Sequence, residues 1–162
     1  MKTWRGKRSV KESLRDEMPQ LVDDWFTAGR VALMPGTPWE QIHHFRLLTK
    51  RFRYTLEIFK SAYGPGIERR VENLRELQTL LGDMNDLVTT SSLLQSLEGM
   101  EEVRARLAQK TDKKKAQLDT LWQRDFDPEA RQTNWRRYLT QYACRTVGRN
   151  KQPVESPEAV VY

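Results

Sequence analysis

Apolar side chains recur at intervals of three and four residues along most of this chain, and this spacing limits its fold more than any other feature. Residues with that spacing lie on one face of an α-helix, whereas a half-buried strand alternates between apolar and polar residues. The helical spacing is clear in Val71, Leu74, Leu77 and Leu81, and no alternating run accompanies it. The pattern therefore predicts an all-α fold, namely an antiparallel bundle of four to five helices.

Breaking residues divide the helical pattern into segments. We expect helices over residues 9–32, 38–62, 67–97, 101–124 and 128–147. Pro19 lies inside the first segment and is expected to kink or split that helix, because proline lacks a backbone donor. Gly82 lies inside the third segment, where the helix either continues or bends.

Three short segments predict where helices start. Residues 9–12 (Ser-Val-Lys-Glu) and 37–40 (Thr-Pro-Trp-Glu) have the spacing of a capping box. In such a box the hydroxyl accepts a hydrogen bond from the first turn, and the glutamate reaches back to the cap. Asp127 is expected to cap the last helix, with Pro128 at its first position, where the missing donor does no harm.

The 162 residues suit a single domain, which we place over residues 1–147. Residues 148–162 contain two prolines and no periodicity, so we expect this tail to be flexible. The single cysteine, Cys144, excludes an intramolecular disulfide. Neither a signal peptide nor a transmembrane segment is recognisable, and we therefore expect a cytoplasmic protein.

The second expected helix has sides of different chemistry. Its large apolar residues share one sector and are expected to face the core: Phe45, Leu48, Phe52, Leu56 and Phe59. Its basic residues recur at similar intervals and are expected on the opposite side: His43, Arg46, Lys50 and Arg53. A third row is available to another helix or to a second subunit: Leu47, Tyr54 and Ile58.

The charge of this helix indicates an anionic partner. The chain has 28 lysines and arginines against 22 acids, and residues 43–60 hold five of these cations and one acid, Glu57. Like charges at helical spacing repel by roughly a few tenths of a kcal/mol per pair, a cost that a bound anion removes. Arginine can donate two hydrogen bonds to one phosphate, and lysine supplies a point charge. An ordinary solvated basic face explains the pattern equally well at this point.

Two linked motifs resemble those of the CHAD family, the conserved histidine α-helical domain. In residues 42–54, His43 is followed three residues later by an arginine and then by a Lys-Arg-x-Arg-Tyr run. Residues 74–86 are similar to the family's second motif and end in Leu-Gly-x-x-Asn-Asp. The resemblance implies a helical bundle that binds inorganic polyphosphate, with no catalysis and no metal or cofactor.

Carried over by position, the resemblance implies polyphosphate-binding roles for six residues: His43, Arg46, Lys50, Arg51, Arg53 and Arg75. It also gives Asn85 and Asp86 a role at the helix junction and Gly82 a role in close helix packing. Arg8, Lys11 and Arg15 are spaced to line the same groove from the first helix, although a solvated face explains them as well. A further basic row on the fourth helix is a weaker candidate: Lys110, Lys113 and Lys114.

CHAD domains usually contain two similar halves, whereas the signature occurs once in these residues, so the chain resembles one half of that arrangement. We expect a homodimer, in which a two-fold axis restores the pair, and association with polyphosphate granules. Nucleic acid is a second candidate partner, although no helix-turn-helix, zinc-finger or RNA-binding signature is present. A third interpretation is an accessory domain that acts beside a phosphate-processing enzyme.

Overall fold

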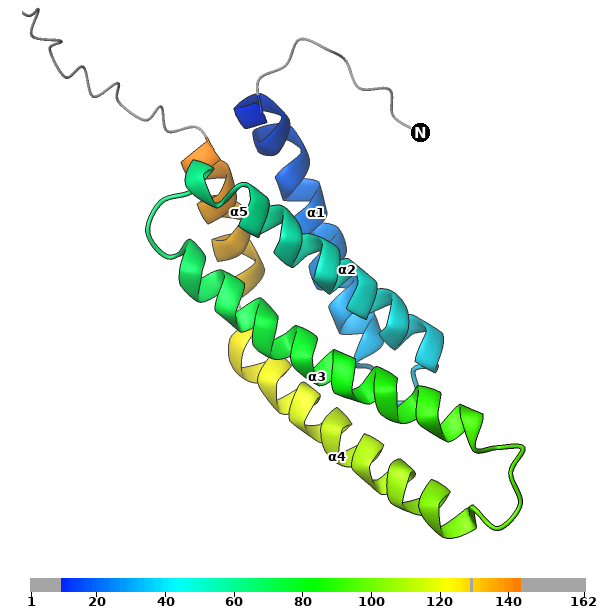
Figure 1. Cartoon of the computed structure of the whole chain (residues 1–162). Helices are drawn as coiled ribbons and strands as arrows, with labels where there is room; N and C mark the ends of the chain where they lie inside the picture. Colours follow the sequence, from blue (N-terminus) through cyan, green and yellow to red (C-terminus); the bar gives the residue numbers. More distant parts are fainter. Residues whose placement is uncertain (1–9, 129, 144–162) are drawn as a thin grey trace, which may run out of the picture.

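The structure of this chain is a computed structural model that describes residues 10–128 and 130–143. These residues form five α-helices and a short 3-10 helix, with no strand among them (Figure 1). The bounds are α1 (Val10–Ala32), α2 (Trp39–Ile58), η1 (Lys60–Ala62), α3 (Ile67–Leu93), α4 (Glu101–Asp125) and α5 (Arg131–Ala143). The predicted all-α bundle is confirmed.

The first four helices run back and forth, each along the one before it, and α5 returns to α1 (Figure 1). In α3 the buried residues end at Met84, and in α4 they begin at Leu118. The far half of the α3–α4 hairpin therefore lies beyond the shared core and extends past the other helices (Figure 1).

An aromatic cluster around Trp25 of α1 forms the centre of the core. The Trp25 side chain is 1% exposed. Its ring centroid lies 4.9 to 6.3 Å from those of six other aromatic residues: Phe26, Phe45, Phe52, Trp122, Phe126 and Trp135. The Trp25 indole N–H donates to Thr49 Oγ1 of α2 over 3.0 Å. The cluster ties α1 to α2, to the C-terminal end of α4 and to α5.

Gly29 lets the Trp122 indole of α4 approach the backbone of α1. A Cβ placed on Gly29 would lie 2.1 Å from Trp122 Cη2, so any larger residue would collide with that ring. A Cβ at Gly82 would instead meet no heavy atom within 4 Å. The prediction that Gly82 permits close helix packing is therefore wrong, and Gly29 has that role.

The start of α2 differs from the predicted capping box. Pro38 is the N-cap residue, and no side chain caps the helix through a hydrogen bond. The Thr37 hydroxyl is instead placed to donate to the carbonyl oxygens of Val31 at 2.9 Å and Met34 at 2.8 Å. Val31 lies in the last turn of α1 and Met34 just after it, so the threonine stabilises the end of one helix rather than the start of the next.

Other predicted boundaries shift little. Neither Pro19 nor Gly82 interrupts its helix, since α1 and α3 each continue through that residue. The last helix begins at Arg131, so the prediction that Asp127 caps it with Pro128 as its first residue is wrong. Ser9 and residues 144–162, with the expected tail, the domain boundary at 147 and the single cysteine, lie outside the described residues.

Replacing Gly29 with alanine is expected to lower the free energy of unfolding by about 1–3 kcal/mol, because overpacking displaces the Trp122 indole. Urea denaturation followed by circular dichroism measures the change. Thr27→Ala, at an exposed position of the same helix, is the matched control and is expected to change stability by less than about 0.5 kcal/mol. Equal stabilities of the two variants would contradict the role assigned to Gly29.

Candidate functional site

The buried face of α2 follows the predicted apolar stripe. Five residues of α2 are buried: Ile42, Phe45, Thr49, Phe52 and Leu56. Leu48 and Phe59 are partly buried and pack against the same core. The predicted core side of this helix is confirmed, and Ile42 and Thr49 extend it.

The spacing predicted that the basic row lies opposite the core, and this prediction is wrong. His43, Arg46 and Arg53 are half-buried, and the row borders α3 instead of facing away from the bundle. Arg46 directly follows the buried Phe45, and one residue step turns a helix by only about 100°. Arg46 therefore lies beside the buried face of α2 and not opposite it. The outermost face of α2 carries three exposed apolar residues: Leu47, Tyr54 and Ile58.

His43 and Asn85 join α2 to α3 near one end of the basic row. His43 Nδ1 lies 3.1 Å from Asn85 Oδ1, a hydrogen-bond distance. Asn85 Nδ2 is 3.5 Å from Asp86 Oδ1, and Asp86 is itself exposed. This contact holds the imidazole at the helix junction, so one ring nitrogen of His43 is already engaged within the protein.

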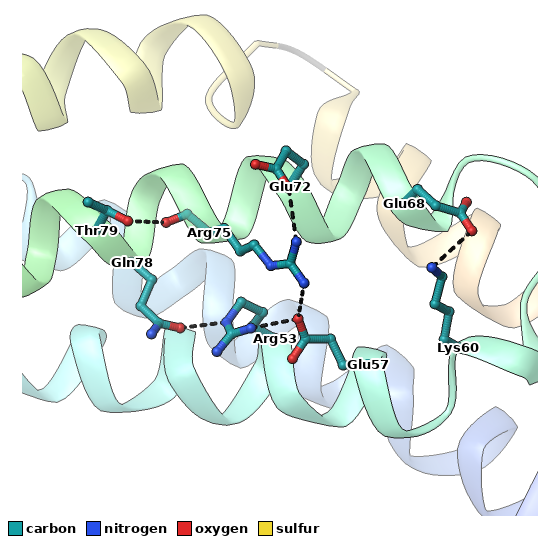
Figure 2. Close-up of polar contacts among 8 residues, drawn as sticks. All are labelled: Arg53, Glu57, Lys60, Glu68, Glu72, Arg75, Gln78 and Thr79. Carbon is teal, nitrogen blue, oxygen red and sulfur yellow. Dashed lines mark hydrogen bonds and ion pairs between the residues drawn. The ribbon is translucent and has the colours of Figure 1, made fainter.

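A network of arginines and glutamates joins α2 to α3 at the other end of the row (Figure 2). Arg53 donates to Glu57 Oε1 over 2.6 Å and to Gln78 Oε1 over 2.7 Å. Arg75 donates to the same Glu57 oxygen over 2.9 Å and to Glu72 over 3.2 Å. These hydrogen bonds, first that to Glu57 and then that to Glu72, raise the pKa of the Arg75 guanidinium. Both predicted site arginines are therefore neutralised by carboxylates of the protein.

Gln78 is a member of this network that sequence reasoning missed. Its side-chain oxygen accepts from Arg53 Nε and fixes the plane of that guanidinium against α3 (Figure 2). The available signal was its place in the second motif, directly after Leu77 and one turn after Leu74. A glutamine at a partly buried helix contact needs a hydrogen-bond partner, and the basic row was the nearest set of donors.

Arg46 and Lys50, here called the open cations, differ from their neighbours. Within the part of the chain that the structure describes, neither pairs with a carboxylate, and Arg46 Nε is buried without a hydrogen-bond partner. Lys50 is exposed, with its Nζ 5.7 Å from the centroid of the Tyr54 ring. Arg51 is also exposed, but it lies one residue step further round α2 and away from α3.

The predicted contribution of α1 falls mostly on undescribed residues. Arg8 and the side chain of Lys11 lie outside the described residues. Arg15, the third residue of that row, is exposed, and its Nε lies 3.5 Å from Asp16 Oδ1.

Two grooves, of about 530 and 970 Å³, lie between α3 and α4 and not between α2 and α3. Their linings mix both signs of charge, with Lys114 Nζ 2.6 Å from Asp83 Oδ2 and Arg124 3.3 Å from Glu76. The weaker basic row of α4 lines the smaller groove: Lys110, Lys113 and Lys114. Because acids oppose these lysines, the α4 row suits a polyanion less well than the open cations do.

The described residues contain neither a metal-binding cluster nor a membrane-spanning helix. No group of three or more His, Cys, Asp or Glu within residues 10–128 and 130–143 is placed to hold a metal ion. None of the described helices is both long and apolar enough to span a membrane.

Replacing His43 with alanine is expected to lower the free energy of unfolding by about 0.5–1.5 kcal/mol, because the half-buried Asn85 loses its partner across the helix junction. Chemical denaturation at neutral pH measures the loss. His44→Ala, at the adjacent exposed position, is the control and should leave the midpoint unchanged. Identical midpoints for the two variants would show that the His43 contact contributes no stability.

The family to which these residues belong follows from comparison with known proteins. A family model described as the CHAD domain matches residues 1–95, which is more than half of the chain. That segment includes all of α2 and the part of α3 that contacts the basic row. No curated protein and no solved structure matches the chain. The chain therefore belongs to the CHAD domain family.

Proposed function

We propose that this protein binds inorganic polyphosphate along α2, without catalysis, and that the open cations carry most of the affinity. The observation that carries the proposal is the unequal pairing within the basic row. Arg53 and Arg75 already share Glu57, whereas Arg46 and Lys50 have no carboxylate partner among the described residues. The association of the CHAD family with polyphosphate supports the same ligand.

A phosphate chain fits the chemistry of the open cations. The Arg46 guanidinium is half-buried and its Nε has no partner, a state that is costly because buried donors are normally satisfied. A phosphoryl oxygen at an accessible guanidinium nitrogen makes a charge-assisted hydrogen bond, which is about twice as strong as a neutral one. Lys50 lies one turn further along α2, so a linear anion parallel to the helix meets both cations.

The non-catalytic part of the proposal rests on the acids. Metal-assisted phosphoryl transfer needs carboxylates that hold a divalent ion beside the phosphate. The acid on this face, Glu57, is bonded to two arginines instead. An accessory role beside a phosphate-processing enzyme is compatible with this arrangement, because such a role needs binding alone.

The double variant Arg46→Ala/Lys50→Ala is expected to bind long-chain polyphosphate about 100-fold more weakly, because each lost charged hydrogen bond removes about 1.5 kcal/mol or more. Isothermal titration calorimetry or fluorescence anisotropy measures the affinity, and thermal unfolding confirms the fold. Lys110→Ala/Lys113→Ala removes the same charge from α4 and is the matched control, with a loss expected to stay below tenfold. Equal losses of affinity in the two variants would show that net charge, and not the position of Arg46 and Lys50, determines binding.

Competition with DNA at equal phosphate concentration separates polyphosphate from nucleic acid. The affinity for either polyanion should fall steeply with salt, since binding releases counterions. Polyphosphate is expected to resist displacement by DNA, because a thin chain can enter the junction between α2 and α3 and a duplex cannot. Complete displacement of polyphosphate by DNA at equal phosphate concentration would favour the nucleic-acid interpretation.

We further propose that polyphosphate joins two copies of the chain through the outer face of α2. Leu47, Tyr54 and Ile58 are exposed along one face of α2, with Ile58 at 73%, and exposed apolar rows of this kind can mark interaction surfaces. The neighbouring Lys50 and Arg51 would repel their counterparts across a two-fold axis. A shared anion would offset that repulsion, so dimerisation should depend on polyphosphate.

Light scattering after gel filtration should therefore show a monomer without polyphosphate and a dimer with it. The variant Leu47→Ser/Ile58→Ser changes two exposed residues and should bind polyphosphate yet remain monomeric. A wild-type protein that stays monomeric when saturated with polyphosphate would exclude the dimer. Dimerisation of the variant to the same extent would show that the phosphate chain bridges two copies without the apolar row.

A further inference from the structure

Gly82 stands at a position where neither backbone conformation nor packing requires glycine. It lies inside α3, and its φ is not among the positive values found at Gly36, Gly66 and Gly99. A Cβ placed there would meet no heavy atom within 4 Å, so the space beside it is empty of protein atoms. Glycine inside a helix is destabilising relative to alanine, and the position therefore calls for a reason outside the folding of the chain.

The contacts between α2 and α3 locate this space. His43 meets Asn85 at one point, and Arg53 meets Gln78 at another. Gly82 lies four residues after Gln78 and three before Asn85, so the three share the face of α3 that borders α2. Between the same two contacts, α2 carries the open cations. The empty space at Gly82, here called the Gly82 gap, therefore lies beside them.

The surroundings of the Gly82 gap are suited to an anion. Its border on α2 is formed by cations that pair with no described carboxylate, one of which has a buried, unpartnered Nε. Of the nearby acids, Glu57 lies beyond the Arg53–Gln78 contact and is held by two arginines, and Asp83 pairs with Lys114 of α4. Asp86 is exposed one turn further along α3, beside Asn85. Because glycine has no side chain, a ligand can also approach the α3 backbone closely at this point.

We propose that the Gly82 gap receives one phosphoryl group of the bound polyphosphate, held by Arg46 and Lys50 of α2 and lying against the α3 backbone at Gly82. This inference rests on the proposed function and adds a residue that determines which anions fit. Glycine contributes because it has no side chain, whereas any side chain at residue 82 would occupy the volume that the phosphoryl group needs. A slender phosphate chain enters the gap, whereas a bulkier polyanion such as a DNA duplex or heparin reaches only its rim.

The experiment measures stability and affinity in Gly82→Ala and Gly82→Leu of the full chain. Both variants are expected to raise Tm, by about 1–4 °C, because helix propensity improves and nothing is displaced. Affinity for long-chain polyphosphate is expected to fall about tenfold in Gly82→Leu, the equivalent of one lost charged hydrogen bond, and less in Gly82→Ala. Heparin affinity should stay within twofold of wild type in both.

Thr89→Leu is the matched control. Thr89 is exposed on the same helix, seven residues after Gly82 and therefore two turns along the same face, beyond the His43–Asn85 contact. Leucine there adds similar bulk outside the gap, so polyphosphate affinity should match wild type. A double-mutant cycle between Gly82→Leu and Arg46→Ala adds a second readout: the two losses should be less than additive, since both remove the same contact.

Each result decides a separate point. Wild-type affinity in Gly82→Leu would overturn the gap as a subsite and leave the proposed function standing. A lowered Tm in that variant would overturn the premise that the space is empty. Fully additive losses of affinity in the double-mutant cycle would show that residues 82 and 46 act independently. That result would reject a phosphoryl group that contacts both. No polyphosphate binding by the wild-type protein would reject the proposed function and this inference together.

Discussion

The rotation of α2 about its own axis depends on one buried hydrogen bond. Trp25 sits at the centre of the aromatic cluster, and its indole N–H would cost about 1–3 kcal/mol if it were left unsatisfied there. Thr49 of α2 supplies the acceptor, so its own side chain faces the core. Thr49 lies between Arg46 and Lys50 in sequence. Because neighbouring positions differ by about 100°, this rotation directs the basic row toward α3.

The charge of the row is then apportioned by acids of the protein itself. Glu57 takes up Arg53 and Arg75 together, and Glu72 adds a second bond to Arg75, which ties α2 to α3 at the end of the row near η1 (Figure 2). The cations nearer Asn85 receive no such partner among the described residues. A row that looks uniform in sequence therefore divides into an end that stabilises the helix junction and a middle whose charge is available to a ligand.

Periodicity was sufficient for the fold because α2 and α3 obey it strictly: Phe45, Phe52, Leu74 and Leu81 are all buried where their spacing placed them. It was insufficient for the basic row, whose direction depends on Thr49. A polar residue is not counted in an apolar stripe, so the stripe's centre was misjudged and the row was placed opposite the core. Charge pairing was predictable only within one helix, as between Arg53 and Glu57, which are four residues apart. Contacts such as Arg75 with Glu57 join residues of two helices that only packing brings together.

Two helical glycines show why residue type alone does not reveal a role. Gly29 has no room for a Cβ, because the Trp122 indole fills the space above it, and its function is packing. Gly82 has room and yet remains glycine, in a helix where alanine would favour folding. The motif around Gly82 predicts close packing at that residue, but that role belongs to Gly29. The proposed site is thus defined as much by the open space beside Gly82 as by the cations of α2 that border it.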